Sequence, residues 1–410
     1  MGLRTFLLLI ASLVCAAAAL ADPGELDPSW GHGGAVRTRL SRDGSKAAIV
    51  FELSFARGRL VAAGGVPSDG ASDNFLIRYL PTGRLDRSFG SGGIVRGAIR
   101  GLGRDWQASL LGDGRVLLGG PTIGRLRADG RLDPRFGTNG RATIAIGRCR
   151  YRAGRALQEP NGRILVSTRS CRDGARDDGV WDIARLLPGG RLDRSFGHAG
   201  VAHIPVGSSN ENPYTWGAED LVRRRDGSIV AAGGVGLADG RFAIAVVKLT
   251  PAGRLDRGFG TGGIAIHRLQ REPSFGDLIL RSDGTVLLSA CDHAHGEPGS
   301  MFVAAFRRDG TPDGSWGTSG VVRLEDRLGV SDTACGNLVE IGGRRIFLLM
   351  HRLALLSPSG RLVASFGDRG VLSPRVADDL ALAPGRRVFV AGGVALPGQT
   401  SGLAVFRYVY

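Results

Sequence analysis

Lysine is almost missing from this 410-residue sequence: Lys46 and Lys248 are the only lysines among 53 basic residues, and the rest are arginines. Methionine, tryptophan and tyrosine are also few, at 3, 5 and 5 residues. After residue 21 no apolar run approaches the roughly 20 residues that a transmembrane helix needs, and no long helical period is found. The sequence therefore excludes a helical membrane protein and a helical bundle, and it predicts less than about 5% helix in the mature chain.

The first 21 residues have the pattern of a secretory signal peptide. Arg4 gives the positive start, residues 6–14 are apolar, and residues 19–21 read Ala-Leu-Ala, a small-residue cleavage site. Cys15 follows the bulky Val14, which disfavours the cleavage that attaches a lipid to a bacterial lipoprotein. We predict a cleaved signal peptide at 1–21 and a secreted or periplasmic mature chain, with a lipoprotein as the less favoured alternative.

The positive charge is large but dispersed. The formal net charge is +15, and the arginines are spread along the whole chain instead of forming a block. A basic surface attracts polyanions such as acidic glycans or nucleic acid. Because no block is present, we expect this attraction to be weak, non-specific and sensitive to salt.

The octet GRLDRSFG occurs at 83–90 and returns unchanged at 190–197. Near-copies are found along the whole mature chain, about 47 to 63 residues apart, and such a period is typical of a solenoid, propeller or array. The seven copies are GELDPSWG (24–31), GRLDRSFG (83–90), GRLDPRFG (130–137), GRLDRSFG (190–197), GRLDRGFG (253–260), GTPDGSWG (310–317) and GRLVASFG (360–367).

Each copy predicts four short strands. The first strand follows the octet, as at 92–99. The second strand ends in a turn pair such as Asp226-Gly227, which is a strong hairpin signal. The third strand (228–234) follows this turn, and the fourth (242–249) ends the copy. Seven copies of four antiparallel strands predict an all-β fold, a seven-bladed β-propeller. A solenoid is disfavoured because the first and last copies look ordinary rather than capping. The predicted domain spans 22–410, with blades of about 24–82, 83–129, 130–189, 190–252, 253–309, 310–359 and 360–410.

The octet has the chemistry of a strained turn between blades. Asp86 can accept hydrogen bonds from the backbone two residues on, Phe89 offers an apolar plug, and Gly90 permits a backbone angle that other residues avoid. A ring of calcium-binding aspartates is disfavoured, because Val363 replaces the aspartate in the last copy and the spacing matches no calcium loop.

The pattern LDxSFGxxG, followed by an Asp-Gly hairpin and an apolar strand, resembles the delta-60 repeat. The resemblance covers the whole mature chain, although Pro312, Arg135, Gly258 and Val363 depart from the pattern. It implies a β-propeller of an exported bacterial protein. It implies no common activity, because a fold does not fix a function.

Connections of variable length predict the binding face. They fall where the first strand of a copy meets the second and where the third meets the fourth, and repeat proteins place such insertions on the face that binds. On this long-loop face, Trp106, Tyr214 and Trp216 are candidate ligand-binding residues that could stack on sugar rings. Asp292, His293 and His295 are a weak metal candidate, for which a solvated loop is the favoured interpretation.

Four cysteines of the mature chain predict two disulfides. Cys149 and Cys171 lie in the two variable connections of the third copy, whereas Cys291 and Cys335 lie in those of the adjacent fifth and sixth copies. The repeat register therefore predicts the pairs Cys149–Cys171 and Cys291–Cys335, since the other pairings exceed the reach of a disulfide.

No linear catalytic motif is found: G-x-S-x-G, H-E-x-x-H and the phosphate-binding G-x-x-x-x-G-K-[ST] loop are all missing. No cofactor is therefore predicted. The sequence favours a module that binds a glycan or protein partner, over a propeller hydrolase or lyase with its site at the channel mouth or a purely structural surface component.

Overall fold

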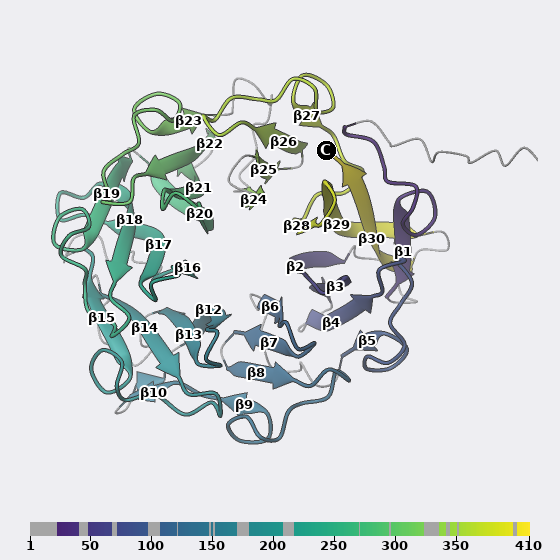
Figure 1. Ribbon diagram of the computed structural model, residues 1–410, viewed down its shortest axis with the longest axis horizontal. Helices are drawn as coiled ribbons and strands as arrows, with labels where there is room; N and C mark the ends of the chain where they lie inside the picture. The colour runs from purple at the N-terminus through teal and green to yellow at the C-terminus, as the bar shows by residue number, and fades with distance from the viewer. Residues whose placement is uncertain are drawn as a thin grey trace, which may run out of the picture.

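The structure is a computed structural model, shown in Figure 1, in which the strands form a closed ring of blades around a central channel. Seven four-stranded antiparallel sheets make up the ring, and the described part of the chain contains no helix. The predicted all-β, seven-bladed propeller is confirmed. The described residues are 23–40, 48–67, 72–96, 107–120, 122–146, 149–150, 152–169, 180–207, 217–269, 271–294, 297–323, 336–341, 345–350, 352–396 and 400–410.

The first two strands of each sheet lie nearest the channel. The innermost strands of blades 1 to 7 are β2 (Ile49–Ala56), β6 (Gln107–Leu110), β12 (Arg152–Gln158), β16 (Asp220–Arg223), β20 (Glu272–Leu280), β24 (Asn337–Ile341) and β28 (Asp379–Ala383). The second strands are β3 (Arg59–Pro67), β7 (Val116–Gly119), β13 (Ile164–Arg169), β17 (Ile229–Gly236), β21 (Val286–Ala294), β25 (Arg345–Met350) and β29 (Arg387–Leu396). Each innermost strand contacts the innermost strands of both neighbouring blades, so the ring is closed.

The other two strands of each sheet lie toward the outside. The third strands are β4 (Ser72–Tyr79), β8 (Ile123–Leu126), β14 (Val180–Leu186), β18 (Phe242–Leu249), β22 (Glu297–Phe306), β26 (Arg352–Leu356) and β30 (Thr400–Val409). The outermost strands are β5 (Ile94–Val95), β9 (Arg141–Ala142), β15 (Val201–Pro205), β19 (Ile264–Leu269), β23 (Val321–Arg323), β27 (Val371–Leu372) and, in blade 7, β1 (Ala35–Arg39). A separate two-stranded hairpin joins β10 (Ala145–Ile146) and β11 (Cys149–Arg150).

The boundaries of the sheets differ by one strand from the boundaries of the sequence copies that were counted from octet to octet. The short strand after each octet pairs backward with the strand before it, as β5 does with β4, and so forms the outer edge of the same sheet. Within the described residues no strand precedes the first octet, and the strand after it, β1, pairs with β30, from Ala35↔Phe406 to Arg39↔Gly402. The two ends of the chain thus share blade 7 and close the ring.

The hydrophobic core is divided into seven clusters, one at each interface between neighbouring blades. Every cluster contains the aromatic residue of one octet, at no more than 1% exposure. These residues are Trp30, Phe89, Phe136, Phe196, Phe259, Trp316 and Phe366. The aromatic position of the octet is therefore the plug between blades that its chemistry predicts.

The octet at 190–197 shows how the turn joins two blades. Asp193 Oδ1 accepts hydrogen bonds from the Ser195 backbone N–H (3.2 Å) and hydroxyl (2.6 Å), which makes the expected Asx turn. The buried Arg185, on the third strand, donates from Nε to Asp193 Oδ2 (2.8 Å) and from Nη1 to the carbonyl of Pro251 in the next blade (2.7 Å). Its guanidinium carbon also lies 4.6 Å from the Phe196 ring centroid. One arginine thus ties the octet to its own strand and to the neighbouring blade.

Gly197 ends this octet with φ at +55°, and a Cβ atom there would lie 2.1 Å from the Val201 carbonyl oxygen. No other residue fits such a space. The Gly197 N–H donates to the Ala252 carbonyl of the next blade at 2.8 Å. The conserved shape of the octet is therefore set by contact with the neighbouring blade as well as by its own turn.

The residue that corresponds to Arg185, here called the arginine position, differs in some blades. Where Val363 replaces the aspartate, Leu355 stands in the place of Arg185, and both side chains belong to one apolar cluster. In blade 4 Lys248 takes the arginine position and pairs with Asp256 at 2.7 Å. Five joints are thus ionic on both sides, and the joint of blade 6 is apolar on both sides. In blade 5 Ala305 takes the arginine position beside Asp313, which instead lies 3.6 Å from Arg307.

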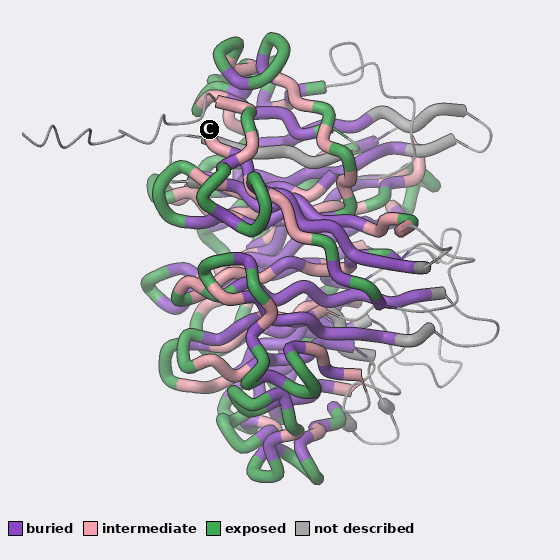
Figure 2. The backbone as a smooth tube through the Cα atoms, turned by 90° about the vertical axis from the view of Figure 1, so that its right-hand side faces the viewer, coloured by how far each residue is buried: buried purple, intermediate pink, exposed green. Residues whose placement is uncertain are grey.

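The propeller has two unlike faces. The hairpin turns between first and second strands and the octet loops lie on one face, here called the turn-side face, and appear as exposed loops along one side of Figure 2. The connections that define the long-loop face, including 41–47, 97–106, 170–179, 208–216 and 324–335, lie outside the described residues. No helix in the described ranges is long and apolar enough to cross a membrane.

Candidate functional site

A ring of seven polar side chains lines the central channel. Each stands directly before a buried apolar residue of an innermost strand, at one shared register position, as Glu52 precedes Leu53 and Asp220 precedes Leu221. This polar ring consists of Glu52, Gln107, Arg155, Asp220, Asp277, Asn337 and Asp379, which all line one cavity of about 540 Å³. With four carboxyl groups and one guanidinium, the ring has an acidic excess inside a strongly basic protein.

Arg155 is the only cation of the polar ring, and it links blades across the channel. Its Nη1 lies 3.1 Å from Glu52 Oε2 of blade 1, and its Nε lies 3.3 Å from Asp220 Oδ1 of blade 4. Arg155 itself belongs to blade 3. The two contacts compensate part of the negative charge that the ring gathers.

Three ring carboxylates also bind the backbone of the next blade. Asp220 Oδ2 accepts from the Leu278 N–H at 3.0 Å, and Asp277 Oδ2 accepts from the Leu338 N–H at 2.8 Å. Asp379 accepts from the Leu53 N–H in the same way, which connects blade 7 to blade 1. These side chains therefore hold the innermost strands together as well as lining the channel.

Crowding and burial raise the pKa values of the ring carboxyls. Burial raises the pKa of Glu52 to about 7, against the attraction of Arg155 and with repulsion from Asp277 and Asp220. The pKa of Asp277 rises to about 6, first through burial and then through repulsion from Asp220. Burial likewise raises the pKa of Asp220, and it raises that of Asp379 well above its usual value, with further repulsion from Glu52. Protons are thus retained in the channel near neutral pH.

These shifts predict that the folded protein loses stability as the pH rises from about 4.5 to 7. In that range the folded chain still holds protons on Glu52 and Asp277 that the unfolded chain has released, so each rise in pH favours unfolding. Urea denaturation at a series of pH values should show the decline, and the E52Q/D277N variant should flatten it. A free energy of unfolding that rises steadily across this interval would contradict the assignment.

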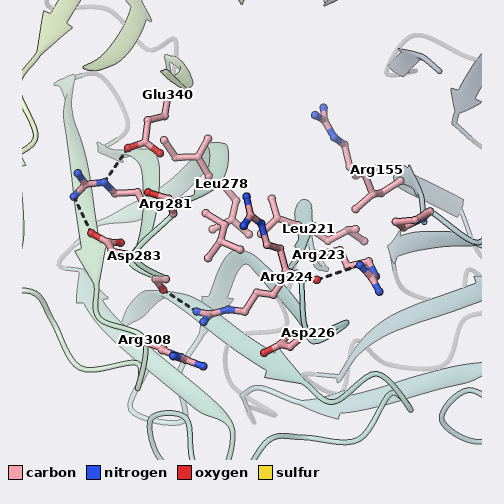
Figure 3. A pocket seen from close by; sticks show the side chains of 18 of the residues that line it. Arg155, Leu221, Arg223, Arg224, Asp226, Leu278, Arg281, Asp283, Arg308 and Glu340 are labelled. Atoms are coloured by element: carbon pink, nitrogen blue, oxygen red, sulfur yellow. Dashed lines mark hydrogen bonds and ion pairs between the residues drawn. The ribbon is translucent and has the colours of Figure 1, made fainter. Parts of the chain in front are cut away.

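A second cavity, of about 1060 Å³, lies beside the polar ring on the turn-side face, and residues of blades 3, 4, 5 and 6 line it. It adjoins the channel cavity, since Arg155, Leu278, Ile279 and Glu340 line both. Figure 3 shows its side chains. We call it the arginine mouth, because six arginines line it against three acidic residues: Arg155, Arg223, Arg224, Arg225, Arg281 and Arg308, with Asp226, Asp283 and Glu340.

The arginines of the mouth differ in how far they are already neutralised. Arg223 Nε donates to Glu159 Oε1 at 3.0 Å, and Arg281 Nε donates to Glu340 Oε1 at 2.9 Å. Arg225 and Arg308 are exposed, and neither makes a side-chain hydrogen bond or ion pair within the described part of the chain. The mouth thus offers cationic groups that no internal carboxylate occupies.

The residues predicted from sequence fall mostly elsewhere. Trp106, Tyr214, Trp216, His295, Cys171 and Cys335 lie outside the described residues. Asp292 is buried and lies 3.7 Å from Arg323 Nη1, while of His293 and Cys149 only the backbone is described. Cys291 is buried in β21. Among the described residues no group of three or more His, Cys, Asp or Glu side chains is placed to hold a metal. The predicted long-loop site and both disulfide pairings stay predictions.

Sequence reasoning missed the polar ring and the mouth, although a signal for the ring is present. In four copies the ring residue stands six positions before the aspartate or asparagine of the hairpin turn: Gln107 and Asp113, Arg155 and Asn161, Asp220 and Asp226, Asp277 and Asp283. A polar residue at one fixed distance from the turn in four copies indicates a shared position on the channel. The mouth has no such signal, because its arginines come from turns of different blades.

Sequence comparison gives a partial match to one family. A family model described as "Domain of unknown function (DUF5122) beta-propeller" matches residues 58–89 and 224–259. Both segments begin near the first hairpin turn of a blade and end at the octet aromatic, Phe89 or Phe259. No curated protein matches the sequence.

Solved structures with a similar fold are propellers of diverse activity. A polysaccharide lyase, a PL25 ulvan lyase, has 11% sequence identity and a TM-score of 0.43, covering 91% of this chain and 96% of its own. Drosophila Semaphorin 2a has 9% identity and a TM-score of 0.47, covering 95% and 76%. The propeller domain of the trilobed protease from Pyrococcus furiosus, which has an open velcro topology, has 10% identity and a TM-score of 0.40, covering 84% and 89%. Likeness at this level concerns the fold alone.

Proposed function

We propose that the protein is a secreted or periplasmic binding module that holds an anionic partner, foremost an acidic glycan, in the arginine mouth. The observation that carries the proposal is the pair Arg225 and Arg308, two exposed cations that line a cavity of about 1060 Å³ and have no side-chain partner among the residues the structure describes. Arginine presents a planar fork that suits carboxylate, sulfate and phosphate groups. A concave site of this volume accommodates several sugar rings.

The remaining charges of the mouth support the same ligand class. Arg223 and Arg281 are paired with Glu159 and Glu340, so they contribute a fixed framework more than free charge. Asp226 accepts hydrogen bonds from the backbone and hydroxyl of Ser228, which occupies its Oδ1. The groups left for a ligand are therefore mainly cationic.

Loss of the two rim cations should weaken binding by about tenfold or more, because hydrogen bonds to charged groups are among the strong ones. Fluorescence anisotropy with a labelled sulfated oligosaccharide would compare the mature protein with the R225A/R308A variant. The matched control is R84A/R87A, which removes the same charge from exposed arginines in an octet on the same face. Equal weakening by both pairs would reduce the effect to general charge and refute the proposed site.

A propeller hydrolase or lyase is the second candidate. It is favoured by the pKa values of Glu52 and Asp277, about 7 and 6, since a carboxyl that keeps its proton near neutral pH can act as a general acid. Against it, three ring carboxylates already accept backbone hydrogen bonds from the next blade. Depolymerisation of an acidic glycan by the mature protein, lost in E52Q, would favour the enzyme.

Several finer features belong to the same proposal. We infer that the leader at 1–21 is cleaved, that the repeats are of the delta-60 kind, and that Cys149–Cys171 and Cys291–Cys335 form disulfides. Non-reducing peptide mapping of the exported protein would identify the pairs, and a Cys149–Cys291 link would refute them. A contribution of Trp106, Tyr214 and Trp216 on the long-loop face is retained as a separate proposal, which their alanine variants would test.

A further inference from the structure

Arg224 is a buried cation whose donors are mostly unused. It is 5% exposed and lines the arginine mouth at the end of β16. Its Nη2 donates to the Gly284 carbonyl of blade 5 at 2.8 Å, and Figure 3 shows the guanidinium directed toward that turn. Its Nε has no hydrogen-bond partner, and within the described chain no ion pair engages the group. Buried charges are normally paired, but no carboxylate in the described part of the chain binds this one directly.

A second cation lies close to Arg224. A Cβ atom on Gly284 would lie 3.3 Å from Arg224 Nη1 and 3.4 Å from the Arg308 stem, so both arginines converge on this turn. Thr285 donates its backbone N–H to Asp283 Oδ1, and Asp226 is held by Ser228. Burial lowers the pKa of Arg224 and repulsion from Arg308 lowers it further, whereas attraction by Asp226 and Asp256 acts in the opposite sense. A bound anion would offset both the cost of burying the Arg224 charge and the repulsion between Arg224 and Arg308.

The polar ring limits how deep an anion can enter. Asp220 begins β16, and Arg224 follows directly after the end of this strand, four residues later, or about 13 Å at the usual rise of a β-strand. The ring carboxyls that remain ionised repel a negative group that passes beyond the mouth. The favourable position for an anionic group is therefore at the level of the hairpin turns of blades 4 and 5.

We propose that Arg224, Arg225 and Arg308 form a subsite for one tetrahedral oxyanion, the sulfate or phosphate ester group of the ligand. Three guanidinium groups from two blades offer donors in several directions, which suits a group with three terminal oxygens better than a planar carboxylate. This inference rests on the proposed function and specifies the ligand group that the mouth selects.

Calorimetric titration of the mature protein with inorganic sulfate, inorganic phosphate and acetate tests the subsite. Sulfate and phosphate should bind at least about tenfold more tightly than acetate, and their ratio distinguishes the two esters. R224K keeps the charge but loses the planar fork, and it should lower oxyanion affinity about tenfold. R308A should do the same, whereas R84A should leave the affinity unchanged.

The variants distinguish the oxyanion subsite from the broader proposal that the arginine mouth binds anionic partners. Should R224A fail to fold, R224K and R308A still report on the subsite. Equal affinity for acetate, or undiminished sulfate and phosphate binding by R224K, would overturn the oxyanion subsite. In that case the sulfated-oligosaccharide comparison of R225A/R308A with R84A/R87A still decides whether the mouth binds anionic partners at all.

Discussion

Deletion of residues 23–40 is expected to abolish cooperative folding of the propeller. The segment supplies β1, the outer strand that pairs with β30, and the first octet with Asp27 and Trp30. Trp30 is 1% exposed and packs against Tyr79 and Phe389, with ring centroids at 6.4 and 5.1 Å. Loss of a buried tryptophan costs about 3–5 kcal/mol.

The deletion also removes an ionic joint. Asp27 lies 2.9 Å from Arg407, whose side chain is 11% exposed, and breaking such a buried pair costs about 3–5 kcal/mol more. Together these losses approach the 5–15 kcal/mol that stabilises a typical domain. Thermal unfolding followed by circular dichroism would compare chains beginning at residues 22 and 41. A similar sharp transition in both would show that β1 does not close the ring.

Replacement of Asp193 by alanine should cost about 3–5 kcal/mol. The side chains of Arg185 and Asp193 are 7% and 6% exposed, so the variant leaves a buried guanidinium without its carboxylate. The neighbouring Phe196 contact and the bond to the Pro251 carbonyl keep Arg185 in place and prevent its escape to water.

The chain itself supplies the control for this substitution. The joint of blade 6 has Leu355 and Val363 in the same two places, so R185L/D193V should recover at least half of the stability lost in D193A. Urea denaturation of the three proteins measures both changes. If the double variant is less stable than D193A, then the ionic and apolar joints are not equivalent solutions.

The fold was predictable because the residues that determine the turn between blades lie next to one another in the sequence. The aspartate of the Asx turn, the aromatic plug and the final glycine stand within eight residues, and they recur seven times with few changes. The phase of the blades was not, since a local pattern does not show whether the strand at 94–95 pairs with β4 before it or with a strand after it. Closure by β1 depends likewise on a partner more than 360 residues away.

The candidate site could not be predicted from short sequence patterns, because its residues are far apart in the sequence and only the fold brings them together. Glu52 and Arg155 are 103 residues apart in sequence, and each resembles an ordinary polar residue at the start of a strand. Arg224 looks like one of three consecutive surface arginines, at 223–225, but only the fold buries it against the turn of the next blade. The dispersed positive charge therefore includes a concentrated site that composition does not reveal.

Hydrogen–deuterium exchange of the mature protein with and without a sulfated oligosaccharide tests the central claim most directly. If the arginine mouth binds the ligand, amides in the turns at 223–228, 281–285 and 307–310 should exchange more slowly in its presence, and R225A/R308A should lose this protection. Protection confined to the long-loop connections at 169–179 and 207–220, with these turns unchanged, would contradict the account.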